Sequence, residues 1–173
     1  MRFGALTVGL CLLAAQAIAG EVQVSDVHLC CGKCLTGATK ALTGIEGVSA
    51  PRANKQTSKV TFTATNMEAA KAGVAALAKA GFYGSAKLGD EAVPAPPSGI
   101  EAGAKGDGAS ISGVHLCCGG CINAAEGAIT SVDGVTGVTS DGKAGTMTVT
   151  GKGISLEALL SALHESGFHG SVK

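Results

Sequence analysis

The chain alternates short segments of period two with longer segments of period three to four, and it does so twice. Residues 60–64 alternate apolar residues with threonine, which predicts a strand with one buried face. Residues 35–45 and 70–77 space their apolar residues three or four positions apart, which predicts helices. The same helical spacing returns at residues 122–132 and 156–163. Each stretch therefore predicts the order strand, helix, strand, strand, helix, strand.

Capping residues mark the ends of the predicted helices. Thr65 with Glu68 forms a capping-box pattern before the second helix of the first stretch, and Ser155 is the matching cap in the second stretch. Gly81 and Gly167 follow these helices and are expected to end them. Two helices on one face of a four-stranded antiparallel sheet form the split βαβ, or ferredoxin-like, arrangement. The predicted class is therefore α+β.

A direct sequence repeat underlies this pattern. Residues 27–34 read Val-His-Leu-Cys-Cys-Gly-Lys-Cys, and residues 114–121 repeat seven of these eight residues. Residues 90–109, between the two copies, include three of the four prolines of the chain and several glycines, which is typical of a linker. The sequence thus predicts two tandem ferredoxin-like βαββαβ domains at 20–89 and 110–173.

Residues 1–19 have the layout of a secretory signal peptide. A short positive start is followed by an apolar run, and Ala17-Ile18-Ala19 places small residues where a signal peptidase cleaves. The run of about 15 apolar residues is shorter than the roughly 20 that a spanning helix needs. We therefore expect cleavage after Ala19, a mature chain without a membrane span, and an exported protein that is periplasmic or secreted. Cys11 then belongs to the leader.

Composition and charge exclude several classes of function. The formal net charge is zero and aromatic residues make up 3% of the chain, which argues against a nucleic-acid binder. Residues 21–88 carry eight basic and four acidic side chains, whereas residues 110–173 carry three and five. Opposite charges favour contact between the two predicted domains or docking on different partners. No set of residues suited to catalysis or to an organic cofactor stands in a supporting pattern, so we expect a protein that is not an enzyme.

The cysteines carry the candidate chemistry. Cys31 and Cys34 are three positions apart at a predicted helix start, where one helical turn brings both sulfurs to the same side. Free N–H groups and the helix dipole favour thiolates there. Thiolates suit soft ions such as Cu(I) or Zn(II). The candidate metal ligands are Cys30, Cys31, Cys34, Cys117, Cys118 and Cys121, with His28 and His115 as further candidates.

Each copy resembles the heavy-metal-associated domain, the βαββαβ fold of copper chaperones, mercury-binding periplasmic proteins and the N-terminal modules of metal-pumping ATPases. The family pattern has Cys-x-x-Cys, then Gly-Val, then Ala-Gly-Tyr or Ala-Gly-Phe. Residues 31–34, 47–48 and 80–82 fit it, as do 118–121 and 134–135, while Ser166-Gly167-Phe168 takes the third place. The resemblance implies a metal-binding loop in each domain, shielded by Phe82 and Phe168.

This sequence departs from the family just before each cysteine pair. Two extra residues lengthen the loop, and Cys30 and Cys117 belong to the insertion. Family expectations rest on two sulfurs, so the coordination number and the metal preference stay open. His169 stands where the first copy has Tyr83, and His164 is expected at the surface.

The sequence therefore predicts an exported protein that binds or transfers a soft metal through a Cys-Cys-Gly-x-Cys loop in each domain. Cu(I) is the expected ion, with Zn(II) or Hg(II) as alternatives, and the expected partners are a metal-transporting membrane protein or another thiol-bearing metal carrier. Three alternatives remain: structural disulfides, a periplasmic thiol-disulfide oxidoreductase, and an interaction module that binds no metal.

Overall fold

The computed structural model describes residues 19–173, so the predicted leader and Cys11 lie outside the described residues except for Ala19. The first half of the described chain contains β1 (Gly20–Ser25), α1 (Gly32–Ala41), β2 (Val48–Asn54), β3 (Lys59–Ala64), α2 (Met67–Lys79), β4 (Ser85–Leu88) and β5 (Glu91–Val93). The second half contains β6 (Lys105–Ser112), α3 (Gly119–Thr130), β7 (Val135–Asp141), β8 (Thr146–Ser155), α4 (Leu156–Glu165) and β9 (Ser171–Val172).

Both halves form an antiparallel sheet with the same strand order. The first sheet runs β2-β3-β1-β4-β5, and the second runs β7-β8-β6-β9. In each, the first and third strands of the half are central neighbours; Val22 of β1 lies opposite Phe62 of β3, and Ile111 of β6 opposite Met147 of β8. The order and the two helices per half are those of the ferredoxin-like arrangement, which confirms the predicted fold class.

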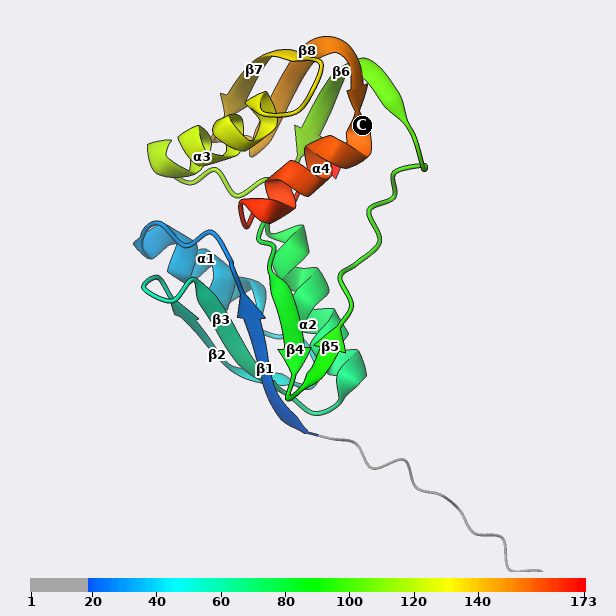
Figure 1. The fold of residues 1–173 in the computed structure, drawn as a ribbon. Coiled ribbons are helices and arrows are strands. Elements are labelled where there is room, and N and C mark those ends of the chain that lie inside the picture. The colour runs from blue at the N-terminus through cyan, green and yellow to red at the C-terminus, as the bar shows by residue number, and fades with distance from the viewer. Residues whose placement is uncertain (1–18) are drawn as a thin grey trace, which may run out of the picture.

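The predicted linker is partly strand. Within residues 90–109, β5 pairs with β4, with Ala86 opposite Val93, and β6 already begins at Lys105. Val93 is buried, which explains why the chain continues the sheet before it reaches the prolines. The irregular connection is therefore shorter than the composition indicates, and it runs along one side of the molecule (Figure 1).

The apolar core lies between the sheet and the helices of each half, and its buried residues form one cluster that continues across both halves. The largest fully buried side chains come from both halves and include Phe62, Leu42, Ile111, Ile129, Met147, Leu159 and Leu163. Because alternate strand residues and one face of each helix supply this core, its composition follows the spacing found in the sequence. None of the helices in the described part is long and apolar enough to cross a membrane.

The helix ends agree with the sequence at three of four predicted positions. Ser155 caps α4 by accepting a hydrogen bond from the backbone N–H of Ala158, at 3.2 Å. Gly81 and Gly167 follow α2 and α4 with φ of 86° and 79°, a backbone conformation that glycine adopts without strain.

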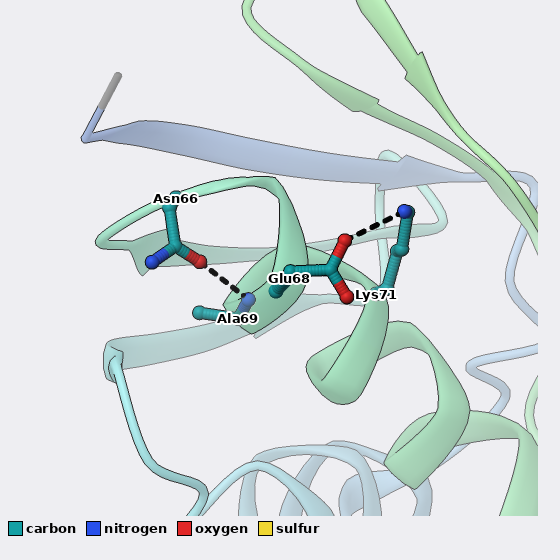
Figure 2. A network of polar contacts seen from close by, with 4 residues as sticks. All are labelled: Asn66, Glu68, Ala69 and Lys71. Atoms are coloured by element: carbon teal, nitrogen blue, oxygen red, sulfur yellow. Dashed lines mark hydrogen bonds and ion pairs between the residues drawn. The ribbon is translucent and has the colours of Figure 1, made fainter. Parts of the chain in front are cut away.

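The capping box predicted for α2 is wrong. Asn66 is the N-cap, and its Oδ1 accepts a hydrogen bond from the backbone N–H of Ala69 at 2.8 Å (Figure 2). Glu68 pairs instead with Lys71, at 2.8 Å. The helix begins one residue later than expected because the backbone N–H of Thr65 is still bonded to the segment before β2. An asparagine cap of this kind contributes about 1 kcal/mol.

The two halves meet at the ends where their cysteine loops lie. In Figure 1 the first half lies below the second, with α1 facing α3 across the junction. This placement brings the loop between β1 and α1 towards the loop between β6 and α3. The candidate site is formed at that junction.

Candidate metal centre between the two halves

Both cysteine loops end at the start of a helix. Cys31 is the N-cap of α1 and Cys118 the N-cap of α3, each with extended backbone. Cys34 and Cys121 are the third residues of these helices, and both are completely buried. One helical turn therefore brings the two sulfurs of each pair to 3.7 Å, as the Cys-x-x-Cys spacing predicts.

The sulfurs of the two loops form one cluster. All six cysteines of the described chain are free. Across the junction, Cys30 Sγ lies 3.4 Å from both Cys118 Sγ and Cys121 Sγ. Cys117 Sγ lies 3.6 Å from both Cys31 Sγ and Cys34 Sγ. The sequence predicted two separate sites, whereas the structure places the two loops against one another.

The buried pair at the centre connects the two loops directly. Cys34 Sγ and Cys121 Sγ are 3.7 Å apart, and each also lies 3.7 Å from the first cysteine of its own loop. Sequence spacing relates residues within a loop and contains no information on this contact. The repeat and the opposite charges of the two copies were the available signals for an association of the two halves.

The helix starts lower the pKa of the two N-cap thiols. The backbone N–H of Cys34 is the main reason why the pKa of Cys31 falls to about 6. The backbone N–H of Cys121 lowers the pKa of Cys118 in the same way, assisted by the thiol of Cys30. Both residues therefore favour the thiolate, the form that binds soft metal ions.

Three other thiols, those of Cys30, Cys117 and Cys121, show the opposite shift. Burial raises the pKa of Cys30 and of Cys117 to about 12, and it raises that of Cys121 further. Protons therefore stay on these sulfurs until a cation replaces them. A metal ion that binds the cluster must release protons as it does so, and its charge then compensates the clustered thiolates.

Backbone hydrogen bonds join the two halves beside the cluster. The segments that follow α2 and α4 lie next to each other. Tyr83 donates its N–H to the carbonyl of Gly167 at 3.1 Å, and His169 donates to the carbonyl of Gly81 at 3.0 Å. His28 also donates its backbone N–H to Gly167, at 3.2 Å. These bonds hold the first cysteine loop against the end of α4.

Phenylalanine and histidine rings pack against each other across the junction. Phe82 and Phe168 face each other in an antiparallel bridge across the junction. Phe168 stacks on His28 with ring centroids 4.3 Å apart, and Phe82 lies at the same distance from His115. Each phenylalanine thus packs against the histidine of the other half. Both phenylalanines are buried, so each belongs to the core and to the junction together.

The two candidate histidine ligands differ in their positions. His28 has a ring nitrogen within 4.8 Å of the sulfurs of Cys30 and Cys121, a spacing compatible with a shared ion. Nε2 of His28 and Nε2 of His115 are both buried without a hydrogen-bond partner. Burial lowers the pKa of both rings, so both are neutral at pH 7 and able to bind a metal.

A second aromatic stack lies at the edge of the junction. His164 lies over Tyr83 with ring centroids 3.5 Å apart and an interplanar angle of 3°. Its Nε2 is 3.0 Å from Nδ1 of His169. The expected surface position of His164 is therefore wrong: the residue is half-buried, because the first half covers the end of α4.

This stack predicts that acid weakens the junction. Burial, with a smaller contribution from His169, lowers the pKa of His164 to about 4. The folded-state pKa lies below the usual value, so the stabilisation is complete above about pH 6.5 and is lost as the pH falls towards 4. The stack is partly solvated, so we expect a loss of about 1 kcal/mol. Thermal unfolding of the metal-free protein at pH 7 and pH 5 measures it.

The His164→Phe variant is the control for this pH dependence, because it keeps the ring and removes the titrating group. Its unfolding temperature is expected to change less between pH 7 and pH 5 than that of the unsubstituted chain. Equal changes in both proteins would show that the stack does not cause the effect.

Comparison with known proteins identifies one part of the chain. Residues 110–169 match the heavy-metal-associated domain family. This segment contains the second cysteine loop, α3 and α4, so the second half of the chain contains a heavy-metal-associated domain. Comparison with curated proteins finds no match.

Two solved structures from Bacillus subtilis CopA cover most of the chain at low similarity. The N-terminal soluble domains of CopA are 18% identical over 91% of this chain and 95% of that chain, with a TM-score of 0.32. The water-soluble region of the P-type ATPase CopA is 20% identical over 91% and 93%, with a TM-score of 0.34. Similarity at this level does not extend any property of CopA to this chain.

Proposed function

We propose that the chain binds a soft metal ion at the six-cysteine cluster and passes it on by exchange of thiolate ligands. The observation that carries this proposal is the convergence of six free thiols, whose closest contacts are 3.4 to 3.7 Å, at the junction of the two halves. A soft cation can replace the protons on these clustered sulfurs and bind several of them at once. The heavy-metal-associated domain at residues 110–169 supports the same class of ligand.

Cu(I) is the proposed ion, with Zn(II) and Hg(II) as alternatives. Soft thiolate ligands favour Cu(I), while Zn(II) in structural sites takes four ligands. Cys31 and Cys118 offer thiolates at the edge of the cluster, next to the exposed glycines 32 and 119. An incoming thiol of a partner can approach there, bind the ion and displace the cluster ligands one at a time.

Export of the chain is part of the proposal. The support is the leader-like pattern of residues 1–19, which predicts a mature chain that begins at Gly20. The mass of the protein recovered from the periplasm of a Gram-negative host tests this, since retention of the leader would contradict it. In that compartment the partners are a metal-transporting membrane protein or another thiol-bearing carrier.

The test of metal binding is a titration of reduced, anaerobic protein with Cu(I) in competition with a chromophoric Cu(I) chelator. We expect the protein to withdraw Cu(I) from the chelator, because the helix starts favour thiolates at the cluster. Conversion of both Cys-x-x-Cys pairs to serine is expected to abolish the uptake. The Cys-to-Ser substitutions concerned are Cys31→Ser, Cys34→Ser, Cys118→Ser and Cys121→Ser.

The matched control for this variant is Thr36→Ala with Thr130→Ala. These hydroxyls lie on α1 and α3 and bond only to carbonyls of their own helices, so metal uptake should not change. Failure of the unsubstituted protein to take up Cu(I), Zn(II) or Hg(II), together with reduction of insulin disulfides, would support a thiol-disulfide oxidoreductase instead.

A further inference from the structure

We propose that the first cysteine of each loop completes the metal site of the opposite half. One site then consists of Cys31, Cys34 and Cys117, and the other of Cys118, Cys121 and Cys30. This inference rests on the proposed function, because it assigns the ligands of the same cluster. It replaces two independent loops with two three-sulfur sites that each span the junction.

The shortest contacts of each first cysteine define these two trios: Cys30 and Cys117 lie 3.7 Å from Cys34 and Cys121 of their own loops, farther than from the pair of the other half. In the first, Cys31–Cys34 is 3.7 Å, and Cys117 lies 3.6 Å from both. The second has the corresponding distances of 3.7, 3.4 and 3.4 Å, between Cys118, Cys121 and Cys30. The trios share no residue, and together they use all six sulfurs of the described cysteines.

The distances fit three-coordinate binding better than linear binding. With metal–sulfur bonds of about 2.3 Å, the sulfurs of a linear site lie about 4.6 Å apart, and those of a trigonal site about 4.0 Å apart. All six sulfur distances in the two trios lie between 3.4 and 3.7 Å. A modest outward movement of the side chains then gives a trigonal site in each trio.

The contacts of Cys30 show how the first cysteine serves the other half. Cys31 and Cys118 have extended backbone, with φ of −147° and −159°. The first cysteine of each loop directly precedes this N-cap residue, and the sulfurs of Cys30 and Cys31 lie within 4.8 Å of each other. Cys30 makes its two shortest sulfur contacts, of 3.4 Å, with Cys118 and Cys121 of the other half, and a longer one of 3.7 Å with Cys34 of its own half.

The junction keeps both crossed contacts in register. The bridge between Phe82 and Phe168 and the paired backbone bonds at Gly81 and Gly167 relate the two halves in the same way on both sides. Each trio draws two sulfurs from one half and one from the other, so a bound ion holds the halves together. The 3.7 Å contact between Cys34 and Cys121 places the two sites side by side.

The experiment isolates one site and then removes each first cysteine in turn. The background variant is Cys118→Ser with Cys121→Ser, which retains the Cys31–Cys34 pair and the first cysteine of each loop. In that background, Cys117→Ser is expected to weaken Cu(I) binding by at least about tenfold, the effect that even outer-shell changes have at metal sites. The matched variant Cys30→Ser is expected to weaken binding less than Cys117→Ser, because the pair that Cys30 completes is already removed.

X-ray absorption at the copper edge provides the second readout. The background protein is expected to show three sulfurs per copper. With Cys117→Ser or Cys117→Ala added, it is expected to show two sulfurs per copper. Circular dichroism checks that each variant folds. Reversed roles, with Cys30→Ser weakening binding and Cys117→Ser neutral, overturn the inference in favour of sites within each loop. The inference is also overturned if neither Cys30→Ser nor Cys117→Ser changes the Cu(I) affinity. Binding of no Cu(I) by the unsubstituted protein instead overturns the proposed function.

Discussion

Replacing Gly81 and Gly167 with alanine is expected to separate the two halves of the molecule. A Cβ atom at Gly81 would lie closer than 3.0 Å to the backbone of His115, and one at Gly167 equally close to the backbone of His28. Backbone atoms cannot move aside as a flexible side chain can, so the junction must open. The six-sulfur cluster then divides into two loops with three cysteines each.

Small-angle scattering measures this separation as a larger radius of gyration, and Cu(I) titration measures its effect on metal affinity. Gly44→Ala is the matched control, because Gly44 has a similar φ of 81° but no atoms within 4 Å of a Cβ. Alanine at this positive φ costs about 1 kcal/mol of stability, but its Cβ atom meets no backbone of the other half. An unchanged radius in the Gly81→Ala and Gly167→Ala double variant would contradict the packing described above.

Metal loading is expected to produce the largest change in stability. A ligand that binds only the folded protein stabilises it by about 4.1 kcal/mol at a free concentration 1,000 times its Kd. For a chain of this size, 1 kcal/mol raises Tm by about 2–4 °C, so we expect a rise of about 8–16 °C. The physical reason is that the ligands of each ion come from two halves that unfolding separates.

Calorimetry under anaerobic conditions, before and after addition of Cu(I), measures this rise, and a Cu(I) chelator should reverse it. The variant with both Cys-x-x-Cys pairs converted to serine should show no rise. A chain that binds two ions but unfolds at the metal-free temperature would show that the unfolded chain binds them equally well, which contradicts ligands drawn from two halves.

The fold follows from the sequence because its signals are local. Alternation at residues 60–64 and the helical stripe at 70–77 correspond to β3 and α2. The missed cap at Asn66 and the missed strand β5 have a different origin. The cap and the strand both depend on where a neighbouring strand stops pairing. The pairing register of the sheet sets that point, and the residues of the cap or of β5 alone do not.

The sequence predicted which thiols lie at the two helix starts, but not how the two loops are arranged. The spacing of Cys31 and Cys34 correctly placed both sulfurs on one side of a helix start. The position of Cys117 beside them depends on the packing of two segments more than 80 residues apart. Nothing in the spacing of a single loop encodes such a contact. The complementary signal was the glycine at 81 and at 167, whose lack of a side chain allows the close approach.

The short connection between β5 and β6 makes the junction independent of protein concentration. Residues 94–104 form a tether whose flexible span is about 18 Å, from the usual 5–6 Å per square root of residue number. A tether of this length keeps each half at a millimolar effective concentration relative to the other. Two separate chains with the same surfaces would dissociate on dilution, and their crossed thiol contacts would disappear. In this chain, the assembly that other proteins achieve by dimerising is a property of one molecule.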